Sequence, residues 1–330
     1  MSVKLPDGLA EFALSAGWGD AGVEPLPGDA SFRRYFRLRR ASGESAMLMH
    51  APPPQEDPAP FLAVARWLAS HGLRAPGIVA ERAAEGWVLL EDFGDARVRD
   101  HLDAVPQDER AVYEGAVEAL VALTRLPAGP WAAYDWAVYL REVRLLVEWY
   151  APAVGLSVDE AGFEAAWEQV LAPVLARQAS GVTVLRDYHA ENIMLLPGGL
   201  KDQGLLDFQD ALAGHPAYDL VSLLQDARRD VAPELEAAML DTYLAATGFE
   251  REAFLADYAV LGAQRNAKIV GIFVRLCRRD GKPRYLDMIP RVWAAMERDL
   301  AHPALAPVAA WFAANIPAPL RAAHGGSITA

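Results

Sequence analysis

The sequence predicts an α+β protein with a small, sheet-rich N-terminal lobe and a larger, mainly helical C-terminal lobe. Alternating apolar and polar residues are frequent in the first ninety or so positions, which is typical of antiparallel strands. Long amphipathic helical patterns begin near residue 106, and short apolar runs around residues 183–208 interrupt them. We therefore expect an N-terminal lobe at residues 1–93 and a helical lobe at residues 94–330.

The first lobe is expected to hold an antiparallel sheet and one helix. Alternation of apolar and polar side chains predicts three strands, at residues 30–40, 45–51 and 86–94. In the first strand, Arg33, Tyr35 and Arg37 share one face. The helix covers residues 57–72, where apolar residues recur at helical spacing. The first two strands form a hairpin because only a short turn, "ASGE", separates them.

The second lobe is expected to consist of amphipathic helices. Apolar residues recur every three or four positions in five long segments: residues 108–126, 135–151, 160–178, 219–230 and 233–248. Helical patterns then continue to about residue 314. Small strands and turns are expected at three short apolar runs: residues 183–187, 192–197 and 204–208.

The composition is that of an ordinary globular protein. The chain has 330 residues, of which 53% are hydrophobic and 23% charged, enough for one large or two medium cores. No segment approaches the roughly 18 uninterrupted apolar residues of a membrane-spanning helix, and the first residues lack the apolar run of a signal peptide. Cys277 is the only cysteine, which excludes an intrachain disulfide and a Cys-rich zinc site. We expect a cytoplasmic monomer without membrane contact.

The formal net charge of −13 bears on the binding partners. General nucleic-acid binders usually present a basic face, so we expect no nucleic-acid partner. A small anionic ligand is still compatible with this charge, because a bound metal ion supplies positive charge locally.

Two acidic residues lie among apolar neighbours in the segments "LRDYHAEN" and "LLDFQDA". A lone carboxylate in such surroundings is costly unless it has a partner or a task. Asp187 is followed five positions later by Asn192, and Asp207 comes after a stretch long enough for a hairpin. Protein kinases use Asp, Asn and Asp in this order, one Asp for the proton of the attacking hydroxyl and the other two residues for magnesium. The pattern predicts a phosphoryl-transfer site that uses ATP and Mg2+.

A structural interpretation of the same residues stays open. Asp187 could cap a turn and Asp207 could be a salt-bridged carboxylate, although that interpretation must explain the two segments independently. His189 is expected to support the loop by a hydrogen bond to Asp187 or to nearby backbone. Asp219 is expected to cap the helix that it begins and to steady the loop around Asp187.

The segments "LRDYHAENIML" and "GLLDFQDALAGHPAYDLVSLL" resemble the aminoglycoside phosphotransferase family, which shares the protein-kinase-like two-lobed fold. More narrowly, "GDASFRRYFRL", "DYHAEN" and "QRNAKIVGIF" are similar to segments of bacterial kinases that phosphorylate N-acetylmuramate and N-acetylglucosamine at C1. These matches extend from residue 28 to about residue 290. The resemblance implies that Asp187 is the catalytic base and touches the acceptor, that Asn192 and Asp207 bind Mg2+, and that the sugar 1-phosphate serves cell-wall recycling.

The first lobe departs from the kinase pattern at the strand of residues 45–51. It has no lysine where kinases place the one that holds the α- and β-phosphates of ATP. Arg33, Arg34 or Arg37 on the neighbouring strand could replace that lysine. The alternative is that these arginines are exposed residues of an edge strand.

Two backbone segments are also expected to contact the nucleotide. The amides of Ala30, Ser31 and Phe32 are candidates for binding phosphate oxygens, although Gly28 is the only glycine of that loop and the motif is weak. The backbone from Glu91 to Phe93 is expected to form the hinge between the lobes and to meet the adenine edge. The alternative for this second segment is a buried strand followed by an exposed acidic turn.

The acceptor is expected to contact a polar face of one C-terminal helix. Four residues share that face at helical spacing: Gln264, Lys268, Gly271 and Arg275. The missing side chain at Gly271 would leave room for a ligand, and the cations could receive the carboxylate of muramate. Asp210 could also face the sugar. The alternative is a helix whose cations pair with surface acids.

Three functions remain open on the sequence alone. The leading one is an ATP-dependent kinase acting at the anomeric hydroxyl of an amino sugar. The second keeps the kinase but changes the acceptor to an aminoglycoside, a choline-like amino alcohol or an amino acid. The third is a nucleotide-binding protein of kinase fold without turnover, which the missing strand lysine favours and the intact Asp187, Asn192 and Asp207 set disfavours.

Overall fold

The computed structural model describes two stretches of the chain, residues 5–27 and 32–328. Their contacts divide the molecule into two units. Unit 1 comprises the residues up to Ala104 together with Glu191–Asp210, and unit 2 comprises Val105–Ala190 and the residues from Ala211 onward. The segment from Glu191 to Asp210 therefore groups with the N-terminal residues, whereas the sequence placed it in the helical lobe.

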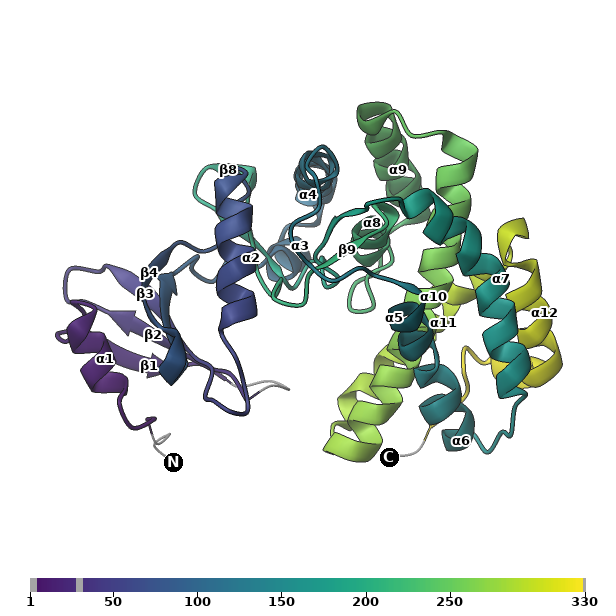
Figure 1. The fold of residues 1–330 in the computed structure, drawn as a ribbon, viewed down its shortest axis with the longest axis horizontal. Coiled ribbons are helices and arrows are strands. Elements are labelled where there is room, and N and C mark those ends of the chain that lie inside the picture. Colours follow the sequence, from purple (N-terminus) through teal and green to yellow (C-terminus); the bar gives the residue numbers. More distant parts are fainter. Residues whose placement is uncertain (1–4, 28–31, 329–330) are drawn as a thin grey trace. The chain divides into compact units, whose positions relative to one another are not determined.

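Unit 1 is built around an antiparallel sheet of five strands in the order β1-β2-β3-β5-β4 (Figure 1). Its elements are α1 (Leu9–Ser15), β1 (Gly22–Pro25), β2 (Arg34–Arg39), β3 (Ser45–His50), α2 (Ala59–Ser70), β4 (Ile78–Arg82), β5 (Trp87–Glu91), α3 (Val98–Ala104), β7 (Ile193–Leu196) and β8 (Gly199–Leu205). The predicted strands and the predicted helix are confirmed as β2, β3, β5 and α2. The prediction of a single helix was wrong, because α1 also packs on the sheet.

Alternation along the strands of unit 1 gives the sheet two different faces. Phe36, Leu48 and Leu89 pack against α1 in one buried cluster. On the opposite face Tyr35 lies across from Met49, and Arg37 lies across from Met47. Figure 1 shows α1 and α2 on opposite sides of this sheet. The period of two in the sequence thus decides which side chains of β2 and β3 share a face.

The hairpin of β7 and β8 is attached to unit 1 by backbone hydrogen bonds. The N–H of Leu195 donates to the carbonyl of Ala96 at 2.7 Å, and the N–H of Leu205 donates to the carbonyl of Arg74 at 2.8 Å. These partners are distant in sequence, so the hairpin strands alone do not reveal the attachment.

Unit 2 is mainly helical, as predicted. Its elements are α4 (Glu109–Thr124), α5 (Trp136–Val143), the π-helical turn η3 (Leu146–Tyr150), α6 (Ala151–Ala153), α7 (Glu160–Gln178), β6 (Val182–Val184), β9 (Leu212–Gly214), α8 (Ala217–Leu224), α9 (Pro233–Thr247), α10 (Arg251–Asp280), α11 (Ile289–Leu300), α12 (Ala306–Asn315) and α13 (Ala318–Ala322). Strands β6 and β9 form a small antiparallel pair. The α+β class is confirmed by the sheet of unit 1 and the helices of unit 2.

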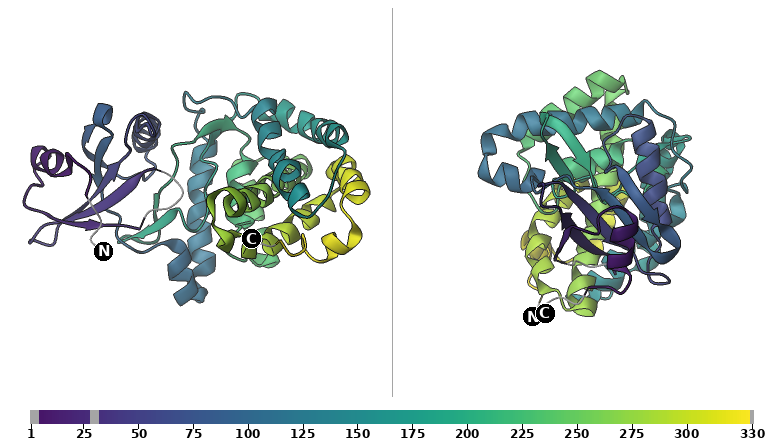
Figure 2. Two further views of the ribbon diagram at one scale, coloured as in Figure 1. Left: turned by 90° about the horizontal axis from the view of Figure 1, so that it is seen from below. Right: turned by 90° about the vertical axis from the view of Figure 1, so that its left-hand side faces the viewer.

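The longest helix of unit 2, α10, lies in the middle of its helices (Figures 1 and 2). It packs against α5, α8, α11 and the turn η3. Glu250 caps its first turn by accepting hydrogen bonds from the N–H groups of Glu252 and Ala253. Because α10 has neighbours on several sides, polar side chains along it are buried, and these side chains need partners.

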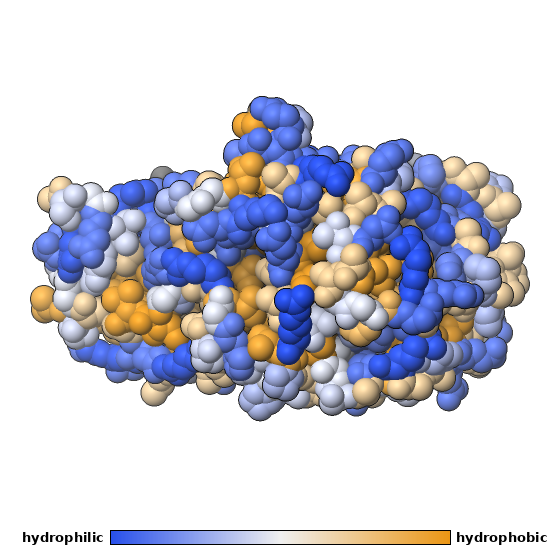
Figure 3. Space-filling model, turned by 90° about the horizontal axis from the view of Figure 1, so that it is seen from above, coloured by the Kyte–Doolittle hydropathy of each residue, from blue (hydrophilic) through white to orange (hydrophobic). Residues whose placement is uncertain are grey.

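Hydrophilic residues cover most of the face seen in Figure 3, with smaller apolar areas between them. Large apolar side chains that are exposed within the described ranges are few and scattered: Leu5, Leu14, Phe32, Val79 and Phe249. Single exposed apolar residues are normal for a folded protein. None of the helices that the structure describes is both long enough and apolar enough to cross a membrane.

Candidate active site

The loop that carries Asp187 follows β6 and is held in place by α8. The carboxylate of Asp219 accepts hydrogen bonds from the N–H groups of Leu185 at 2.6 Å and Arg186 at 2.8 Å. Ser222 donates to the carbonyl of Arg186 at 3.2 Å. Arg186 itself has a φ of +72°, a conformation that few residues other than glycine adopt. Such a conformation persists only where surrounding contacts enforce it, and these three hydrogen bonds do so.

Asp219 supports the loop but does not cap its helix. It lies inside the first turn of α8, where Pro216 occupies the cap position, so the predicted capping role was wrong. Burial raises the pKa of the Asp219 carboxyl to about 7, against the opposing effect of its two backbone hydrogen bonds. The predicted role in steadying the loop is confirmed by those two bonds.

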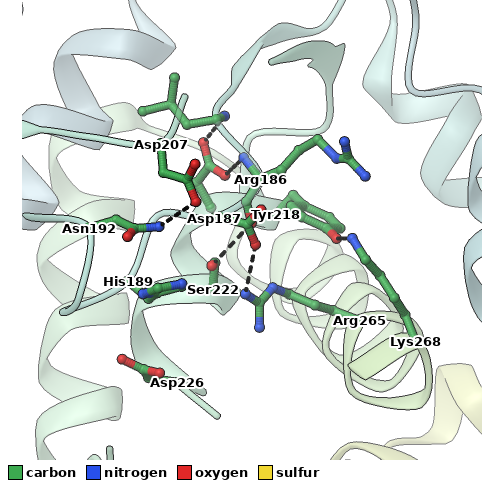
Figure 4. Close-up of polar contacts among 12 residues, drawn as sticks. Arg186, Asp187, His189, Asn192, Asp207, Tyr218, Ser222, Asp226, Arg265 and Lys268 are labelled. Atoms are coloured by element: carbon green, nitrogen blue, oxygen red, sulfur yellow. Dashed lines mark hydrogen bonds and ion pairs between the residues drawn. The ribbon is translucent and has the colours of Figure 1, made fainter. Parts of the chain in front are cut away.

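Asp187 lies beside cations of unit 2. Nη2 of Arg265 is 3.9 Å from its Oδ1, and the Arg265 side chain is 3% exposed whereas that of Asp187 is 46% exposed (Figure 4). Withdrawal from water pushes the pKa of the Asp187 carboxyl upward, but nearby positive charge, that of Lys268 foremost, outweighs this and lowers the pKa below its ordinary value. Asp187 is therefore an ionised carboxylate that presents part of its side chain to solvent.

A buried ionic cluster lies next to this carboxylate. Nζ of Lys268 is 3.1 Å from Glu142 and 3.2 Å from the hydroxyl of Tyr218, and Arg186 pairs with the same glutamate. Burial pushes the pKa of Glu142 upward, yet Lys268 and Arg186 lower it on balance, so the cluster is charged. Sequence analysis did not single out Glu142 or Arg265, and the only signal for them was a charged residue within an otherwise apolar helical pattern.

The imidazole of His189 lies beside an arginine of unit 2. Its Nε2 lies 3.2 Å from Nη1 of Arg228. Burial, with help from Arg228, lowers the pKa of His189 to about 3, so its imidazole is neutral at neutral pH. Because arginine can only donate, Nε2 accepts this hydrogen bond and Nδ1 carries the proton.

Asn192 and Asp207 come together within unit 1. The amide nitrogen of Asn192 donates to Oδ2 of Asp207 at 3.3 Å (Figure 4). Gln209 donates to Oδ1 of the same carboxylate at 2.9 Å. Asp207 has a φ of +59°, again unusual for a residue with a side chain. Phe208 next to it is fully buried and stacks on Phe61 of α2 at 5.0 Å, which anchors the strained residue.

The Asn192 and Asp207 pair fits a magnesium ion that binds together with a nucleotide. Within residues 5–27 and 32–328, no three or more His, Cys, Asp or Glu side chains are grouped so as to hold a metal ion. Magnesium is usually bound through one or two carboxylates, with phosphate and water oxygens completing its shell. Because Asn192 donates through its nitrogen, its amide oxygen is the atom suited to a cation.

The backbone N–H groups that were expected to contact the nucleotide lie in two segments of unit 1. Ala30 and Ser31 lie outside the described residues. The N–H of Phe32 donates to the Glu56 carboxylate at 3.2 Å, so it is not directed at a ligand. The N–H of Glu91 donates to the carbonyl of Gly77 at 2.7 Å. The Glu91 N–H is therefore occupied within unit 1.

Side chains of the same segment are engaged within unit 1. The Glu91 carboxylate pairs with Arg74, with Nη1 to Oε2 at 2.7 Å, and the guanidinium of Arg74 lies over the ring of Phe93 at 4.9 Å. The Phe93 ring also fills the space beside Gly204, where a Cβ would overlap it. Phe93 thus fastens the segment after β5 to the β7–β8 hairpin.

The polar face of α10 is a contact between helices, which corrects the expectation of an open ligand face. Gln264 is fully buried and donates to the carbonyl of Tyr139 at 3.2 Å. A Cβ at Gly271 would overlap the backbone of Leu145, so the space expected for a ligand is filled. Burial lowers the pKa of Arg275, and Glu148 is among the charges acting on it.

The partners of this face follow in order along α5 and η3. Gln264 meets Tyr139, Lys268 meets Glu142 and Gly271 meets Leu145. Positions increase together along both segments, so they run in the same direction. Of the four predicted residues, Lys268 is the one named among the charges that lower the pKa of Asp187. Asp210, in contrast, is exposed in the turn between β8 and β9.

The family model described as "Phosphotransferase enzyme family" matches residues 22–255 of this chain. The chain is 40% identical to a protein of Caulobacter vibrioides named N-acetylmuramate/N-acetylglucosamine kinase, over 94% of this chain and 97% of the relative. It is 39% identical to a Pseudomonas aeruginosa protein of the same name, over 89% of each. Among solved structures, a choline/ethanolamine kinase family protein from Mesorhizobium loti matches with a TM-score of 0.61 at 16% identity, over 92% of this chain and 96% of that one. This last match shows a shared fold.

Proposed function

This chain belongs to the phosphotransferase enzyme family, and on that basis we propose that it transfers a phosphoryl group from ATP to an amino sugar. The proposed acceptors are N-acetylmuramate and N-acetylglucosamine, which the names of its relatives contain. One observation carries the proposal. A carboxylate flanked by cations, Asp187, is followed in the chain by a carboxylate and an amide 3.3 Å apart, Asp207 and Asn192.

We propose that these three residues act as one site. Asp187 and Asn192 are five positions apart in the chain. An extended chain spans at most about 3.5 Å per residue, so their Cα atoms are separated by no more than about 18 Å. Asp207 is tied to Asn192 by a hydrogen bond. The three side chains thus have the connectivity that a single active site requires.

Asn192, through its amide oxygen, and Asp207, through its carboxylate, are the residues that would hold Mg2+. When bound, the ion supplies positive charge against the phosphates of ATP. Positive charge at this place matters here because the chain carries a formal net charge of −13. Without it, an acidic protein repels a polyanionic ligand.

Asp187 is proposed to orient the acceptor hydroxyl and to take its proton. A bond forms between the hydroxyl oxygen and the γ-phosphorus, the bond from that phosphorus to the bridging oxygen breaks, and ADP leaves. Positive charge, that of Lys268 foremost, keeps the pKa of Asp187 low, which makes it a weak base. Asp187 therefore contributes mainly by positioning the hydroxyl, and it accepts the proton late in the transfer.

The proposed acceptor atom is the anomeric hydroxyl, and the product is a sugar 1-phosphate for cell-wall recycling. Of the residues expected to contact the sugar, we retain Asp187 and Asp210, of which Asp210 is exposed. Gln264, Lys268 and Arg275 are not retained as sugar contacts, because their helix face packs against α5 and η3. The positive charge of Lys268 acts on Asp187 instead.

Incubation with ATP, Mg2+ and each amino sugar, followed by NMR, tests the proposal. The expected product shows phosphorus coupled to the anomeric carbon and proton. Choline, an aminoglycoside and the C1-methyl glycosides of both sugars serve as control acceptors in the same assay. Phosphate on another hydroxyl, or turnover with the methyl glycosides, would contradict anomeric specificity, and consumption of ATP only with choline or the aminoglycoside would redirect the acceptor class.

A nucleotide-binding protein without turnover is the second candidate, and the absence of a lysine from β3 is the observation that favours it. The same assay separates the two. Nucleotide binding without phosphorylation of any acceptor supports the second candidate, and sugar phosphorylation that disappears in Asp187→Asn removes it.

A further inference from the structure

Arg265 is a cation in the middle of α10, and it is only 2% exposed. Figure 4 shows Arg265 and Lys268 extending from the same helix toward the loop of Asp187. A guanidinium withdrawn from water is costly unless partners or a task offset that cost. The phosphoryl transfer proposed above gives Arg265 no task, so its partners must explain why it is buried.

The partners of Arg265 are fewer and more distant than its burial requires. In the part of the chain that the structure describes, its one ion pair is with Asp187, and Nη2 lies 3.9 Å from Oδ1. That separation is too long for a direct hydrogen bond. The other terminal nitrogen, Nη1, is buried and has no hydrogen-bond partner among the described residues. Buried polar atoms without a partner are rare in folded proteins, and where they occur they often serve a function.

Shielded arginines of unit 1 have closer carboxylates. The side chain of Arg37 is 5% exposed, and its nitrogens lie 2.8 Å from Asp92 and 2.8 Å from Asp95. The side chain of Arg33 is 14% exposed, and its Nε lies 3.3 Å from Glu56. In both cases a carboxylate at close range accounts for the shielded charge. The buried arginine of α10 differs from both, because its carboxylate is farther away.

Lys268 lies one turn further along α10 and has an acid of its own. Its Nζ is 3.1 Å from Glu142 and 3.2 Å from the hydroxyl of Tyr218. Arg186 pairs with the same glutamate. Lys268 is thus held by close structural partners, although its charge also reaches Asp187. Its burial needs no further explanation.

The charge of Arg265 also acts on two buried acids that hold the loop of Asp187. Asp219 accepts hydrogen bonds from the start of this loop, and Asp226 accepts one from the N–H of Ala190 at 3.3 Å. Burial raises the pKa of both carboxyls, while backbone hydrogen bonds and the charge of Arg265 oppose the rise. Arg265 therefore lies within electrostatic reach of both acids that hold the loop and of the carboxylate that the loop presents.

We propose that Arg265 is a positioning residue for Asp187, and that its charge holds the Asp187 carboxylate in the orientation that receives the acceptor hydroxyl. The inference rests on the proposed function in that Asp187 meets the acceptor. Opposite charges attract more strongly at a shielded site than in water, so a pair at 3.9 Å restrains a carboxylate that is 46% exposed. Because the contact is not a hydrogen bond, Arg265 does not compete with the acceptor hydroxyl for the carboxylate.

Steady-state kinetics of Arg265→Gln and of the matched control Arg275→Gln test this role. Both variants remove one positive charge from α10, but the charges that act most strongly on Asp187 do not include that of Arg275. For N-acetylglucosamine with ATP and Mg2+, we expect kcat of Arg265→Gln to fall roughly ten- to hundredfold, because a misplaced catalytic group loses that much. The dissociation constant for ADP should stay within about twofold of the wild type. A kcat of Arg265→Gln equal to that of the control would overturn the inference.

Arg265→Lys separates charge from shape. Lysine keeps the positive charge but lacks the planar fork of the guanidinium. We expect this variant to recover part of the kcat that Arg265→Gln loses. A lysine variant as slow as the glutamine variant would contradict a role that depends on charge. The lysine variant also keeps the test decisive if Arg265→Gln folds poorly.

A double-mutant cycle shows whether Arg265 acts through Asp187. Single-turnover rates are measured for Arg265→Gln in the wild type and in the Asp187→Asn background. Because the amide carries no charge to hold, Arg265→Gln should lower the residual rate of Asp187→Asn by less than about threefold. The same factor in both backgrounds would show that Arg265 acts independently of Asp187 and would overturn its positioning role.

Denaturant unfolding of the same four proteins tests the ion pair without turnover. Removing Arg265 from the wild type breaks the pair, whereas in Asp187→Asn the pair is already lost. The shift in the unfolding midpoint caused by Arg265→Gln should therefore be more favourable to the folded state in the Asp187→Asn background. Equal shifts in the two backgrounds would show that the two side chains do not interact.

Failure of this inference and failure of the proposed function give different results. A wild type that phosphorylates the sugar, together with an Arg265→Gln variant that matches the Arg275→Gln control, would remove the inference and keep the function. A wild type that phosphorylates neither amino sugar would remove the function, and the positioning role with it, whatever the unfolding cycle shows.

Discussion

The two units hold their functional side chains in different ways. In unit 1, Asp207 is exposed and Arg33 retains some exposure. In unit 2, Glu142, Arg265 and Lys268 are buried, with exposed fractions of 5%, 2% and 8%. Charges that remain near water cost little to fold and can gain partners from a ligand, whereas buried charges need partners in the folded protein. The comparison teaches that the named charges of unit 1 contribute less to the stability of the fold than the buried ionic cluster of unit 2.

The largest effect is expected from Asp187→Asn. The amide cannot take the proton of the acceptor, so kcat should fall by roughly two to four orders of magnitude. Because the residues proposed to bind the nucleotide belong to unit 1, the dissociation constant for ADP should stay within about twofold of the wild type. Single-turnover phosphorylation and ADP titration measure the two quantities. Wild-type turnover in this variant would contradict the assignment of the base.

Asp207→Asn sharpens the comparison from the side of unit 1. Losing one carboxylate charge should raise the Mg2+ concentration for half-maximal activity by roughly tenfold or more. The free energy of unfolding should change by no more than about 0.5 kcal/mol, because the residue is exposed. Activity at graded Mg2+ and thermal unfolding check both parts. An unchanged Mg2+ requirement would remove Asp207 from the metal site.

Asp219→Asn is the matched test in unit 2, where the residue that holds the Asp187 loop is also buried in the fold. One of the two N–H groups of Leu185 and Arg186 would face an amide nitrogen, and an unpaired buried donor costs about 1–3 kcal/mol. We expect lower stability together with lower kcat. A loss of activity at unchanged stability would show that Asp219 supports the site without stabilising unit 2, which would contradict the difference drawn between the two units.

The pH dependence of stability provides a further check on Asp219. Its pKa of about 7 in the folded protein exceeds the ordinary value of 3.8, so between these pH values the folded state binds the extra proton. Stability from this group is full below about pH 4 and decreases as the pH rises to about 7. The difference in unfolding free energy between wild type and Asp219→Asn should therefore narrow over that interval. A constant or widening difference would contradict the raised pKa.

Gly271→Ala tests the helix contact through its effect on stability. A Cβ there would overlap the backbone of Leu145, and overpacking of this kind costs about 1–3 kcal/mol. Gly22→Ala is the matched control, because its Cβ would meet only the carbonyl oxygen of Arg39 at 3.8 Å. Denaturant unfolding of both variants measures the difference. Equal stability of the two variants would show that α10 and η3 are less closely packed than the structure indicates.

Much of the fold could be predicted from local patterns. The strands β2, β3 and β5 and the helices α2, α4, α7 and α9 were all expected, because alternation or helical spacing extends over many residues. The elements that were missed are short: α1 has seven residues and β1 has four. Segments of this length carry too few repeats for a period to be recognised. The family resemblance found in the motifs is confirmed by the match to the phosphotransferase model.

The candidate site could be predicted only in part. The order and spacing of Asp187, Asn192 and Asp207 pointed to phosphoryl transfer, since those residues are close in sequence. The ion-pair partners that the structure shows are Arg265 for Asp187 and Glu56 for Arg33. Both partners are far away in the chain and belong to no motif. For the polar face of α10, the sequence predicted a ligand contact where the structure has a contact between helices. Polar residues at helical spacing look the same in the sequence in both cases.

The amino-acid sequence alone was enough to predict the class of the fold from periodicity, the family from the resemblance of its motifs, and the order and spacing of Asp187, Asn192 and Asp207, because these are all local properties of the chain. Only the folded chain shows that Glu56 pairs with Arg33, and which face of α10 is buried against α5. These choices depend on contacts between residues far apart in sequence, and the energies of burial and ion pairing that select them exist only once the chain has folded.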